Sequence, residues 1–536
     1  RDSLGEKGIE VDIDSKTKTY EEQFLVYKSL TYTSENLTIS YPISDHEGKT
    51  LRPSIIVSRL KKIFPNINIK SYVLKDLDNS SESALDNITV KAPTFNELIN
   101  AIKEFEIRGD INEVYLDLYR YFLGDEEYKN KLEKVVSGLS YTNQVEKVER
   151  EKIKQLYENK NLSISKLERY AQCPFSYFIQ YGLKAQERKE YSFTAPDLGS
   201  FIHNILDIFS KSLNKDKLNW HEIDEDYIRS RVSIIVDEMV SKIPGFILNS
   251  SERYKYLAYR LKKMLVSAIS IISMQIKQGN FEPVDYEVSF RKNGKYPPIK
   301  IVLNDGEEVT LVGQIDRIDE LEKDDNKYIR IIDYKSGDKS INLTEVYYGL
   351  QLQLLVYLDA IIDSDRYKKT NLKPAAILYN RIDNPIVRSN EDQKDSVINE
   401  EILKKLRMNG LVLKDVDIIG EMDMSLKEGE RKTSLIIPAN FDKNGNIGRY
   451  TKGVTESEFD ILREYVKYEV KELCERMVGG DISIIPCKNK NGTSCDFCTY
   501  SSICQFDTSI KGNIYTILND KSDEEVIKLM EKEVKK

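Results

Sequence analysis

The spacing of apolar and polar residues changes along this chain between the period of a strand and the period of a helix, which predicts a mixed α/β protein. Residues 309–321 and 327–337 have the pattern of two strands, and the polar segment 322–326 between them is typical of a turn. We therefore expect a β-hairpin. In residues 345–361 the apolar side chains recur at helical spacing, which predicts a helix with one apolar face soon after the hairpin.

The N-terminal part of the chain has a more helical pattern. Residues 19–41 predict a helix followed by a short strand over 37–41, and residues 52–156 predict mostly helix. The dense mixed charge of residues 144–160 is typical of a solvated helix or of a connector, so we place a domain boundary near residue 160. The final segment, 522–536, predicts one solvated amphipathic helix.

Length and composition are those of a globular protein with several domains. The 536 residues correspond to about three or four domains. The 40% of hydrophobic and 31% of charged residues exclude the disordered and fibrous classes. No apolar run approaches the ~18 residues that cross a bilayer, and the first residues lack the apolar core of a signal peptide. We therefore expect a cytoplasmic protein with no membrane partner, and the start at Arg1 indicates a piece of a longer chain.

The overall charge gives no sign of a nucleic-acid-binding protein. Lys and Arg total 80 residues and Asp and Glu total 88, which leaves a net charge of −8 at pH 7. A negative field of this kind does not attract phosphate groups. Any contact with DNA must therefore be local, or shared with a partner that supplies positive charge.

Acidic and basic side chains stand at the ends of both predicted hairpin strands. Asp333 and Lys335 are two positions apart, so they point to the same face of their strand, and a hairpin can bring Asp316 beside them. Carboxylates hold Mg²⁺, which lowers the pKa of a bound water, and an ammonium group offsets charge in a phosphodiester transition state. This set of groups therefore indicates phosphodiester hydrolysis.

The Asp-x-Lys spacing is weak by itself, because it also occurs at residues 14–16 in a polar stretch without strand character. Charged residues at strand ends are usually only solvated. The surrounding pattern strengthens the hydrolytic interpretation, since Gln353 and Tyr357 follow on the predicted helix, where a spacing of four makes their side chains neighbours.

His203 opens an apolar helix at the end of the segment LGSFIH. A histidine at the edge of a packed helix is usually a packing residue, because imidazole is readily buried and hydrogen-bonded. Its neutral nitrogen can also complete a metal site. The residues alone leave both interpretations open.

The six cysteines are too few for a disulfide scaffold and gather near the C-terminus. Three of them form a close group, and a fourth in a Cys-Pro-Phe segment lies far upstream. Four thiolates can hold Zn²⁺ or a [4Fe–4S] cluster, and the absence of the tandem Cys-x-x-Cys pairs of zinc ribbons favours the cluster over zinc. Unliganded thiols are the alternative. The proposed ligands are Cys173, Cys495, Cys498 and Cys504, whereas Cys474 and Cys487 are expected to be ordinary thiols.

The motifs in their order along the chain carry a resemblance. They are SKLERYAQCPFSYF, LGSFIH, GQIDRID, IIDYKSG, QLLVY and CDFC followed by a further Cys. Together they resemble the RecB-like nuclease domain with an iron–sulfur staple, as in the AddB family of subunits from bacterial helicase–nuclease complexes. The resemblance implies an α/β fold with a restriction-endonuclease-like nuclease core over residues 161–510.

The same resemblance assigns roles to individual residues. It implies that the metal ligands are His203, Asp316, Asp333 and the carbonyl group of Tyr334, and that Lys335 is the catalytic lysine. It places Gln353 and Tyr357 in a helix motif near the scissile strand, and it makes Cys173, Cys495, Cys498 and Cys504 the cluster ligands. Glu287 is a further candidate, as an accessory acid.

Residues 21–41 resemble the last motif of superfamily-1 helicases, with Tyr32 where that motif has an arginine that contacts ATP. The nearest approach to a phosphate-binding loop is Gly48-Lys49-Thr50, but Ile43 stands at its first glycine position. We therefore expect no ATP hydrolysis here. The expected domains are a mostly helical helicase-like remnant with a connector (1–160), the nuclease domain (161–510) and a helical tail (511–536).

These inferences predict a Mg²⁺-dependent deoxyribonuclease that cuts single-stranded DNA as an AddA-like helicase–nuclease subunit delivers it during the processing and recombinational repair of DNA breaks. The alternative is an inactive DNA-end-binding or scaffold subunit with a structural cluster. The presence of Asp316, Asp333 and Lys335 together disfavours that alternative, because an inactive site would be free to lose any of them. A nuclease stapled by zinc is a third possibility.

Overall fold

The computed structural model describes residues 15–45, 49–67, 69, 84–85, 88–139, 141–144, 147–157, 161–186, 188, 193–242, 248, 250–367, 370–387 and 395–535. The chain divides into two compact units, Arg1–Leu139 and Ser140–Lys536, called here the first and second units. Among the helices described, none combines the length and the apolar character needed to span a membrane.

The first unit is helical, as the sequence predicts. Its helices are α2 (Ser15–Thr31), α3 (Ile55–Ile63), α5 (Lys91–Arg108), α6 (Glu113–Gly124) and α7 (Lys129–Leu139). Helices α5 to α7 pack around a small core that includes Phe95, Leu98 and Phe122, in which the rings of Phe95 and Phe122 meet edge to face. Amphipathic patterning is sufficient to predict helices α5 to α7.

The strand predicted over 37–41 is wrong. These residues form no ladder with any described segment, and Leu37 and Ile39 are about half exposed. A strand needs a partner for its peptide groups and an apolar surface for one face, and the alternation of residues does not supply either. Gly48, at which the nearest phosphate-loop-like sequence begins, lies outside the described residues.

The second unit is built on a mixed β-sheet with strand order β1-β4-β5-β6-β7-β8, in which β2 and β3 also pair with β4. A smaller sheet has the order β10-β9-β11. The strands are β1 (Asn161–Ser163), β2 (Glu282–Phe290), β3 (Ile299–Val302), β4 (Glu308–Lys323), β5 (Asn326–Lys335), β6 (Asn371–Arg381), β7 (Asn409–Leu413), β8 (Gly453–Val454), β9 (Cys487–Asn489), β10 (Gly492–Thr493) and β11 (Thr516–Ile517). The mixed sheet with covering helices confirms the predicted α/β class.

The predicted hairpin is confirmed as the antiparallel pair β4–β5. Arg317 pairs with Ile332, and the ladder runs to Lys323 and Asn326 at the turn. Asp324 and Asp325 in the turn have positive φ of 50° and 58°, as a two-residue hairpin turn of the primed type requires. Strand β6 then adds to β5 in parallel, so β5 is paired on both sides.

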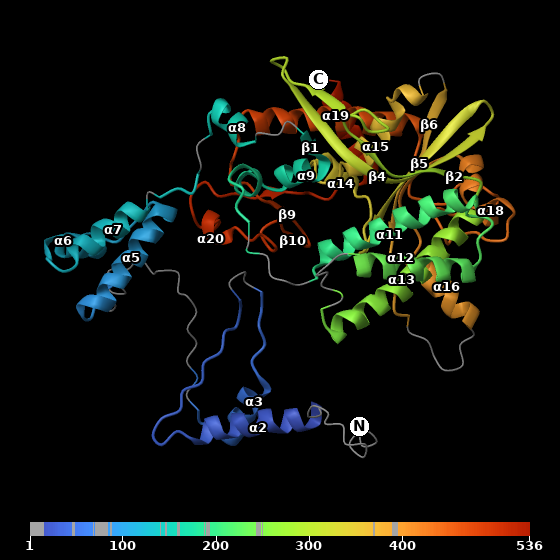
Figure 1. Ribbon diagram of the computed structural model, residues 1–536. Coiled ribbons are helices and arrows are strands. Elements are labelled where there is room, and N and C mark those ends of the chain that lie inside the picture. Colours follow the sequence, from blue (N-terminus) through green and yellow to red (C-terminus); the bar gives the residue numbers. More distant parts are fainter. Residues whose placement is uncertain are drawn as a thin grey trace. The chain divides into compact units, whose positions relative to one another are not determined.

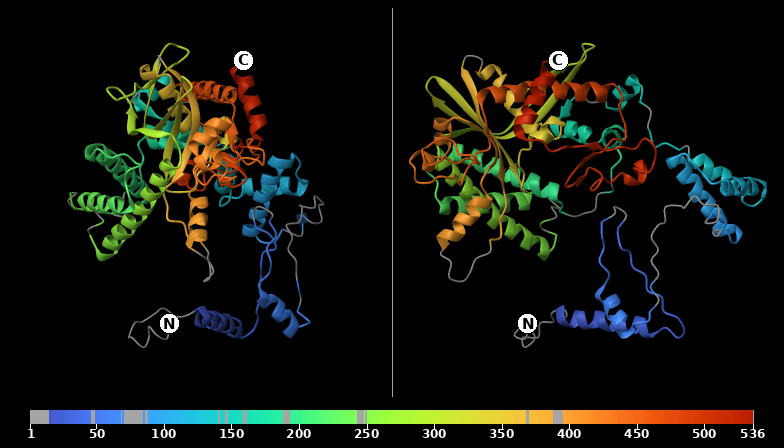
Figure 2. Two further views of the ribbon diagram at one scale, coloured as in Figure 1. Left: turned by 90° about the vertical axis from the view of Figure 1, so that its right-hand side faces the viewer. Right: turned by 180° about the vertical axis from the view of Figure 1, so that it is seen from behind.

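Helices cover both faces of the sheet (Figure 1). On one side are the long helices α11 (Ala195–Asp216), α12 (Glu225–Lys242) and α13 (Glu252–Lys277). On the other are α9 (Ile164–Gln172), α14 (Leu343–Tyr347), α15 (Gln353–Ile362), α19 (Glu456–Val478) and α21 (Asp523–Val534). The view at 90° in Figure 2 shows the sheet between these two groups. The shorter helices of the unit are α8 (Arg150–Leu156), α10 (Pro174–Tyr177), η1 (Phe178–Gly182), η3 (Asp365–Tyr367), α16 (Asp395–Lys405), α17 (Val416–Met422), α18 (Met424–Lys427) and α20 (Ser501–Cys504).

The single helix predicted over 345–361 is two helices, α14 and α15, separated by a turn. Gly349 adopts φ +74° in this turn, and a Cβ added there would lie 3.0 Å from Leu473 and 3.1 Å from a carboxylate oxygen of Glu469. Both neighbours belong to α19. The break therefore depends on how closely the turn approaches α19, which the periodicity of the segment does not record.

Two elements at the ends of the second unit pack more closely than predicted. Helix α8, within the charged segment assigned to a connector, buries Ile153 and contacts α19, so this segment belongs to the second compact unit, which begins at Ser140. The C-terminal helix α21 is amphipathic as predicted, but Val526 and Met530 are buried and the helix contacts α19 and α14.

Glu469 provides a test of the packing between α19 and the turn at Gly349. Burial raises the pKa of the Glu469 carboxyl group from its ordinary 4.5 to about 7, although Arg476 and a hydrogen bond from Tyr465 oppose the shift. Because the folded pKa is higher than the unfolded one, the folded state loses stability as the pH rises from about 4.5 to 7. The penalty is complete above about pH 7 and reaches at most about 3 kcal/mol.

We therefore expect Glu469→Gln to raise the midpoint of thermal unfolding relative to the unaltered protein at pH 8, and to have little effect at pH 4.5. Glu464→Gln, an exposed position on the same helix, is the matched control and should show no such pH dependence. Equal effects of Glu469→Gln at both pH values would contradict this account.

Candidate active site

The β4–β5 hairpin brings two carboxyl groups together. The ladder pairs Arg317 with Ile332, and its continuation by one position sets Asp316 opposite Asp333 on the same face. Both are almost fully buried, with 6% and 1% of their surfaces exposed. The backbone N–H of Tyr334, the residue after Asp333, donates to Asp316 Oδ2 at 2.7 Å. This hydrogen bond links the two strands beside the two acids. Whether the Tyr334 carbonyl group binds a metal stays a prediction.

His203 reaches this hairpin from α11. Its Nδ1 lies 3.0 Å from Glu287 Oε1 and 3.4 Å from Asp316 Oδ1. One potential ligand atom from each of these three residues lies within 4.8 Å of those of the other two. In the described part of the chain, no other group of three or more His, Cys, Asp or Glu side chains meets this condition. One imidazole nitrogen and two carboxylates suit a hard divalent cation that accepts oxygen and nitrogen ligands.

Glu287 is held at this place by an unusual backbone conformation. Its neighbours Tyr286 and Val288 pair with Arg317 and Ile315, which sets Glu287 across from Asp316, yet Glu287 itself has φ +45°. A residue other than glycine in this region costs about 1–3 kcal/mol. The side-chain amide of Gln314 donates to its other carboxylate oxygen. Sequence reasoning named Glu287 only as an accessory acid, because nothing in the alternation of β2 reveals a strained residue.

Asp333 has a different set of neighbours. The Lys335 ammonium lies 2.6 Å from its Oδ2, and the Gln353 side-chain amide donates to its Oδ1 at 2.8 Å. The same Gln353 nitrogen lies 3.0 Å from the Tyr357 hydroxyl oxygen. The structure thus brings Lys335, Gln353 and Tyr357 to Asp333, while Asp333 itself lies outside the three-residue group around His203.

Gly313, the first residue of the GQIDRID motif, allows this approach. A Cβ at Gly313 would lie 3.1 Å from the Tyr357 ring and closer still to the ring of Phe290. Those two rings pack edge to face with centroids 5.5 Å apart. The glycine is therefore needed so that α15 can bring Tyr357 against β4.

The charges at the site strongly influence one another. Burial, followed by the charge of Asp316, raises the pKa of Asp333 to about 6, while Lys335 opposes the shift. Burial also raises the pKa of Asp316, and His203 opposes it. Burial would lower the pKa of His203, but hydrogen bonds from the ring to Asp316 and Glu287 outweigh it and raise this pKa to about 10. Burial therefore disfavours the charged forms of both aspartates, and a neighbouring positive charge favours them.

The opposite face of the hairpin carries a buried ionic group that sequence reasoning missed. Arg317 Nε and an Arg317 terminal nitrogen each lie 2.8 Å from the Asp319 carboxylate, and Arg330 Nε lies 2.6 Å from it. All three residues have no exposed surface. Removing one partner of such a group usually costs about 3–5 kcal/mol. The second aspartate of GQIDRID, Asp319, is the sequence signal for this group. Because side chains alternate along β4, Asp319 lies on the face opposite Asp316.

The four predicted cluster thiols also come together. Cys173 lies between α9 and α10, and the other three lie in the segment that follows β10, where the N–H of Cys498 donates to the Cys495 carbonyl at 3.0 Å. Burial, followed by the neighbouring thiols, raises the pKa of Cys495 to about 11. Among the described residues, no three of these sulfur atoms lie within 4.8 Å of one another.

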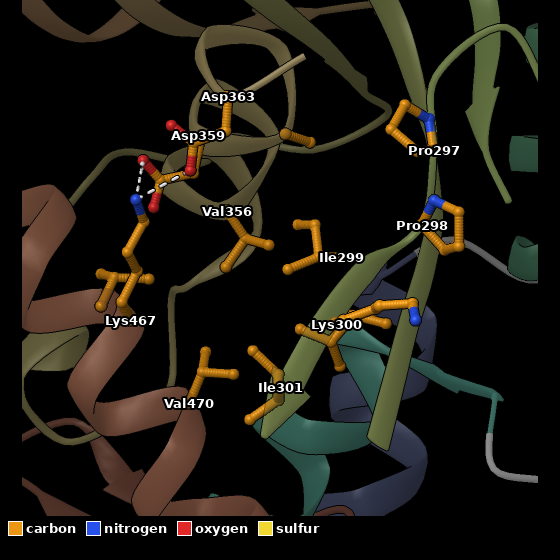
Figure 3. Close-up of a pocket in the computed structure, with 13 residues that line it drawn as sticks. Pro297, Pro298, Ile299, Lys300, Ile301, Val356, Asp359, Asp363, Lys467 and Val470 are labelled. Carbon is orange, nitrogen blue, oxygen red and sulfur yellow. Dashed lines mark hydrogen bonds and ion pairs between the residues drawn. The ribbon is translucent and has the colours of Figure 1, made fainter. Parts of the chain in front are cut away.

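A separate cavity of about 280 Å³ lies between α15, α19 and the edge strand β3 (Figure 3). Val356, Ile299 and Val470 give it an apolar wall, and at its rim Lys467 lies 2.9 Å from Asp363. The charged groups at this rim are paired with each other. The cavity therefore offers no acid and base set comparable to the one on the hairpin.

Two protein families match different parts of the chain. The PD-(D/E)XK nuclease superfamily matches residues 161–505. A second family, described as the ATP-dependent helicase/deoxyribonuclease AddB fifth domain, matches residues 80–138. The first match contains the hairpin acids, His203 and the four thiols, and the second lies in the helical first unit.

Curated relatives are similar over the whole chain. A protein of Clostridioides difficile (strain 630) is 64% identical over 538 residues, which cover 100% of this chain and 47% of the relative. Proteins of Caldanaerobacter subterraneus subsp. tengcongensis and Clostridium acetobutylicum are 52% and 46% identical, each over 100% of this chain and 46% of the relative. All three are named as the same subunit of an ATP-dependent helicase/deoxyribonuclease. The chain thus spans about half the length of the relatives it matches.

The position of Glu287 leads to a prediction about cation binding. We expect Glu287→Gln to weaken Mg²⁺ or Mn²⁺ binding about 10- to 100-fold in calorimetric titrations, because it removes one negative charge from the three-residue group. Glu282→Gln is the matched control: Glu282 is exposed on the same strand and also pairs with a histidine, His221. If both variants bind the cation like the unaltered protein, Glu287 is not a ligand.

Proposed function

Because the chain belongs to the PD-(D/E)XK nuclease superfamily, we propose that its acidic site hydrolyses phosphodiester bonds of single-stranded DNA in a Mg²⁺-dependent reaction. The observation that carries this proposal is the meeting of His203, Glu287 and Asp316 within 4.8 Å, on the hairpin that also holds Asp333 and Lys335. Metal-dependent hydrolysis of a phosphodiester uses a bound cation and a nearby positive side chain. In this proposal the three-residue group holds the cation and Lys335 is the positive side chain.

The residues of the chain have distinct tasks in this proposal. His203, Glu287 and Asp316 hold the divalent cation, and Asp333 joins them from the next strand. When bound, the cation lowers the pKa of a water molecule and polarises the scissile phosphate. Lys335, whose side chain is 29% exposed, stabilises the negative charge that develops on the phosphate oxygens. Gln353 keeps Asp333 in one orientation through its amide.

The proposal extends to the assembly from which the chain comes. The relatives are named as one subunit of a helicase/deoxyribonuclease, which supports a role for this chain as the nuclease-bearing part of such a subunit. An AddA-like partner would unwind DNA during break processing and recombinational repair. The acidic net charge of −8 fits this arrangement, since the partner can supply much of the positive channel for the strand. The proposed domains are a helicase-like remnant with a connector (1–160), the nuclease domain (161–510) and a helical tail (511–536), and the connector packs on the second compact unit through α8.

The four thiols are proposed to hold a [4Fe–4S] cluster that closes the nuclease domain. Cys173 is 322 positions before Cys495, so a shared cluster ties the start of the domain to its end. Cross-linking a loop of this length removes much conformational freedom from the unfolded chain. Burial raises the pKa of the Cys173 thiol, so without a bound centre the thiol is held in its neutral form, and binding a cluster would release its proton.

The central test of the function is Asp333→Ala. We expect this variant to lose Mg²⁺-dependent release of nucleotides from single-stranded DNA, while it still folds and keeps the iron content of the unaltered protein. Asp325→Asn, in the turn at the other end of the hairpin, is the control and should cleave normally. EDTA should abolish cleavage by the unaltered protein and by Asp325→Asn. Undiminished cleavage by Asp333→Ala would refute the assignment.

The same assay separates the nuclease from an inactive scaffold. Full-length protein assembled with its partner should lose part of its single-strand degradation when Asp333 is replaced, and the cleavage that remains would belong to the helicase–nuclease partner. A complex that binds DNA ends tightly but cleaves equally with and without Asp333 would place the nuclease activity in the partner, and this chain would then serve only to bind DNA.

The cluster has its own test. Protein purified without oxygen is expected to be brown, with about four iron atoms per chain, and Cys498→Ser should lower the iron content and the midpoint of unfolding together. Cys474→Ala, in the core of α19, is the control and should keep its iron. A colourless protein loaded with zinc would reject the cluster in favour of a zinc staple.

A further inference from the structure

Helix α15 begins without a local cap. The first N–H groups of a helix have no partners within it, and a polar side chain at the residue before the helix usually accepts from them. Here that residue is Leu352, whose side chain cannot accept. Glu168, on α9, takes this role instead: its Oε1 accepts from the backbone N–H of Leu352 at 2.8 Å and of Gln353 at 3.1 Å. The cap comes from 184 residues away in the sequence.

The residue whose backbone is capped is also the residue that touches the hairpin acid. Gln353 is the first residue of α15, and its side chain donates to Asp333 Oδ1 at 2.8 Å. A shift of the first turn of α15 would therefore move the amide away from Asp333. We propose that Glu168 is a positioning residue of the nuclease site, which holds Gln353 against Asp333 by capping α15. This inference rests on the proposed function and adds a residue to its machinery.

The role of Glu168 depends on an oxygen atom in the right place more than on a negative charge. Burial raises the pKa of the Glu168 carboxyl group, and the charges of Lys339 and Lys335 and the two backbone hydrogen bonds oppose the shift. The positive end of the helix dipole favours a carboxylate here by only about 0.3–1 kcal/mol. A neutral amide oxygen at the same distance would accept the same two N–H groups. Glutamine should therefore replace Glu168 better than aspartate does.

Helix α9 fixes where that oxygen lies. Its buried face includes Leu167 and Tyr170, on either side of Glu168 in the sequence, and the Tyr170 hydroxyl donates to the Asp481 carbonyl at 3.0 Å. The helix ends at Gln172, directly before Cys173, one of the four thiols. The side chain of Glu168 is thus carried on a short helix of nine residues that is packed along its length and followed directly by a proposed cluster ligand.

The experiment compares two substitutions of Glu168 that separate position from charge. Glu168→Gln keeps the acceptor oxygen at its place and removes the charge, whereas Glu168→Asp keeps the charge and withdraws the oxygen by one methylene group. In full-length protein with its partner, we expect Glu168→Asp to lower kcat for single-strand cleavage about 10- to 100-fold with KM changed less than about threefold. Glu168→Gln should stay within about threefold of the unaltered enzyme.

A double-mutant cycle tests whether Glu168 acts through Gln353. If it does, adding Glu168→Asp to Gln353→Ala should cause little further loss of kcat, because the amide that Glu168 positions is already absent. A merely structural role would instead give losses that multiply. Asp415→Ala is the control, since the Asp415 carboxylate also accepts from two backbone N–H groups at the start of a helix, α17, and its loss should lower the unfolding midpoint without changing kcat.

Three results would overturn the proposal: full activity in Glu168→Asp, equal losses in Glu168→Asp and Glu168→Gln, or multiplicative losses with Gln353→Ala. Each is read against the unaltered enzyme and Asp333→Ala. If the unaltered enzyme shows no cleavage that depends on Asp333, the proposed function fails. If that cleavage is present and Glu168→Asp has no effect on it, only the positioning role fails.

Discussion

Three carboxyl groups, those of Glu287, Asp316 and Asp333, lie close together and almost without solvent at one end of the β4–β5 hairpin. Holding like charges in such a place is costly, and cations or hydrogen-bond donors must offset the cost. The imidazole of His203 and the ammonium of Lys335 provide two of these offsets within the protein. In the proposed function, a divalent cation bound by these acids would offset the rest of the cost.

The surrounding structure keeps the acids in place from several directions. On the far side of the hairpin, Asp319 is enclosed by two arginines with no exposed surface, which fixes the register of the two strands. On the near side, the absence of a side chain at Gly313 lets Tyr357 pack against β4. Helix α9 adds the cap on α15. Contacts between segments up to 185 residues apart thus converge on one short stretch of sheet.

Several features followed from the sequence because the signals that encode them are local. Period-two alternation on both sides of a polar turn predicted the hairpin, and the two-residue spacing of Asp333 and Lys335 predicted their common face. The helical first unit and the C-terminal helix followed from amphipathic spacing. The prediction of a strand over 37–41 was wrong because alternation is a property of one segment, whereas a strand also needs a second strand to pair with.

The sequence by itself determined which residue types carry chemistry and on which face of each element they lie, since both depend on neighbours one to four positions away. Only the tertiary structure decided that Glu287 would face His203 through a positive φ, that the helix after the hairpin would break at Gly349, and that Glu168 would cap its second half. These outcomes depend on how closely distant segments approach one another. The periodicity of a single segment gives no information about the energy of such contacts.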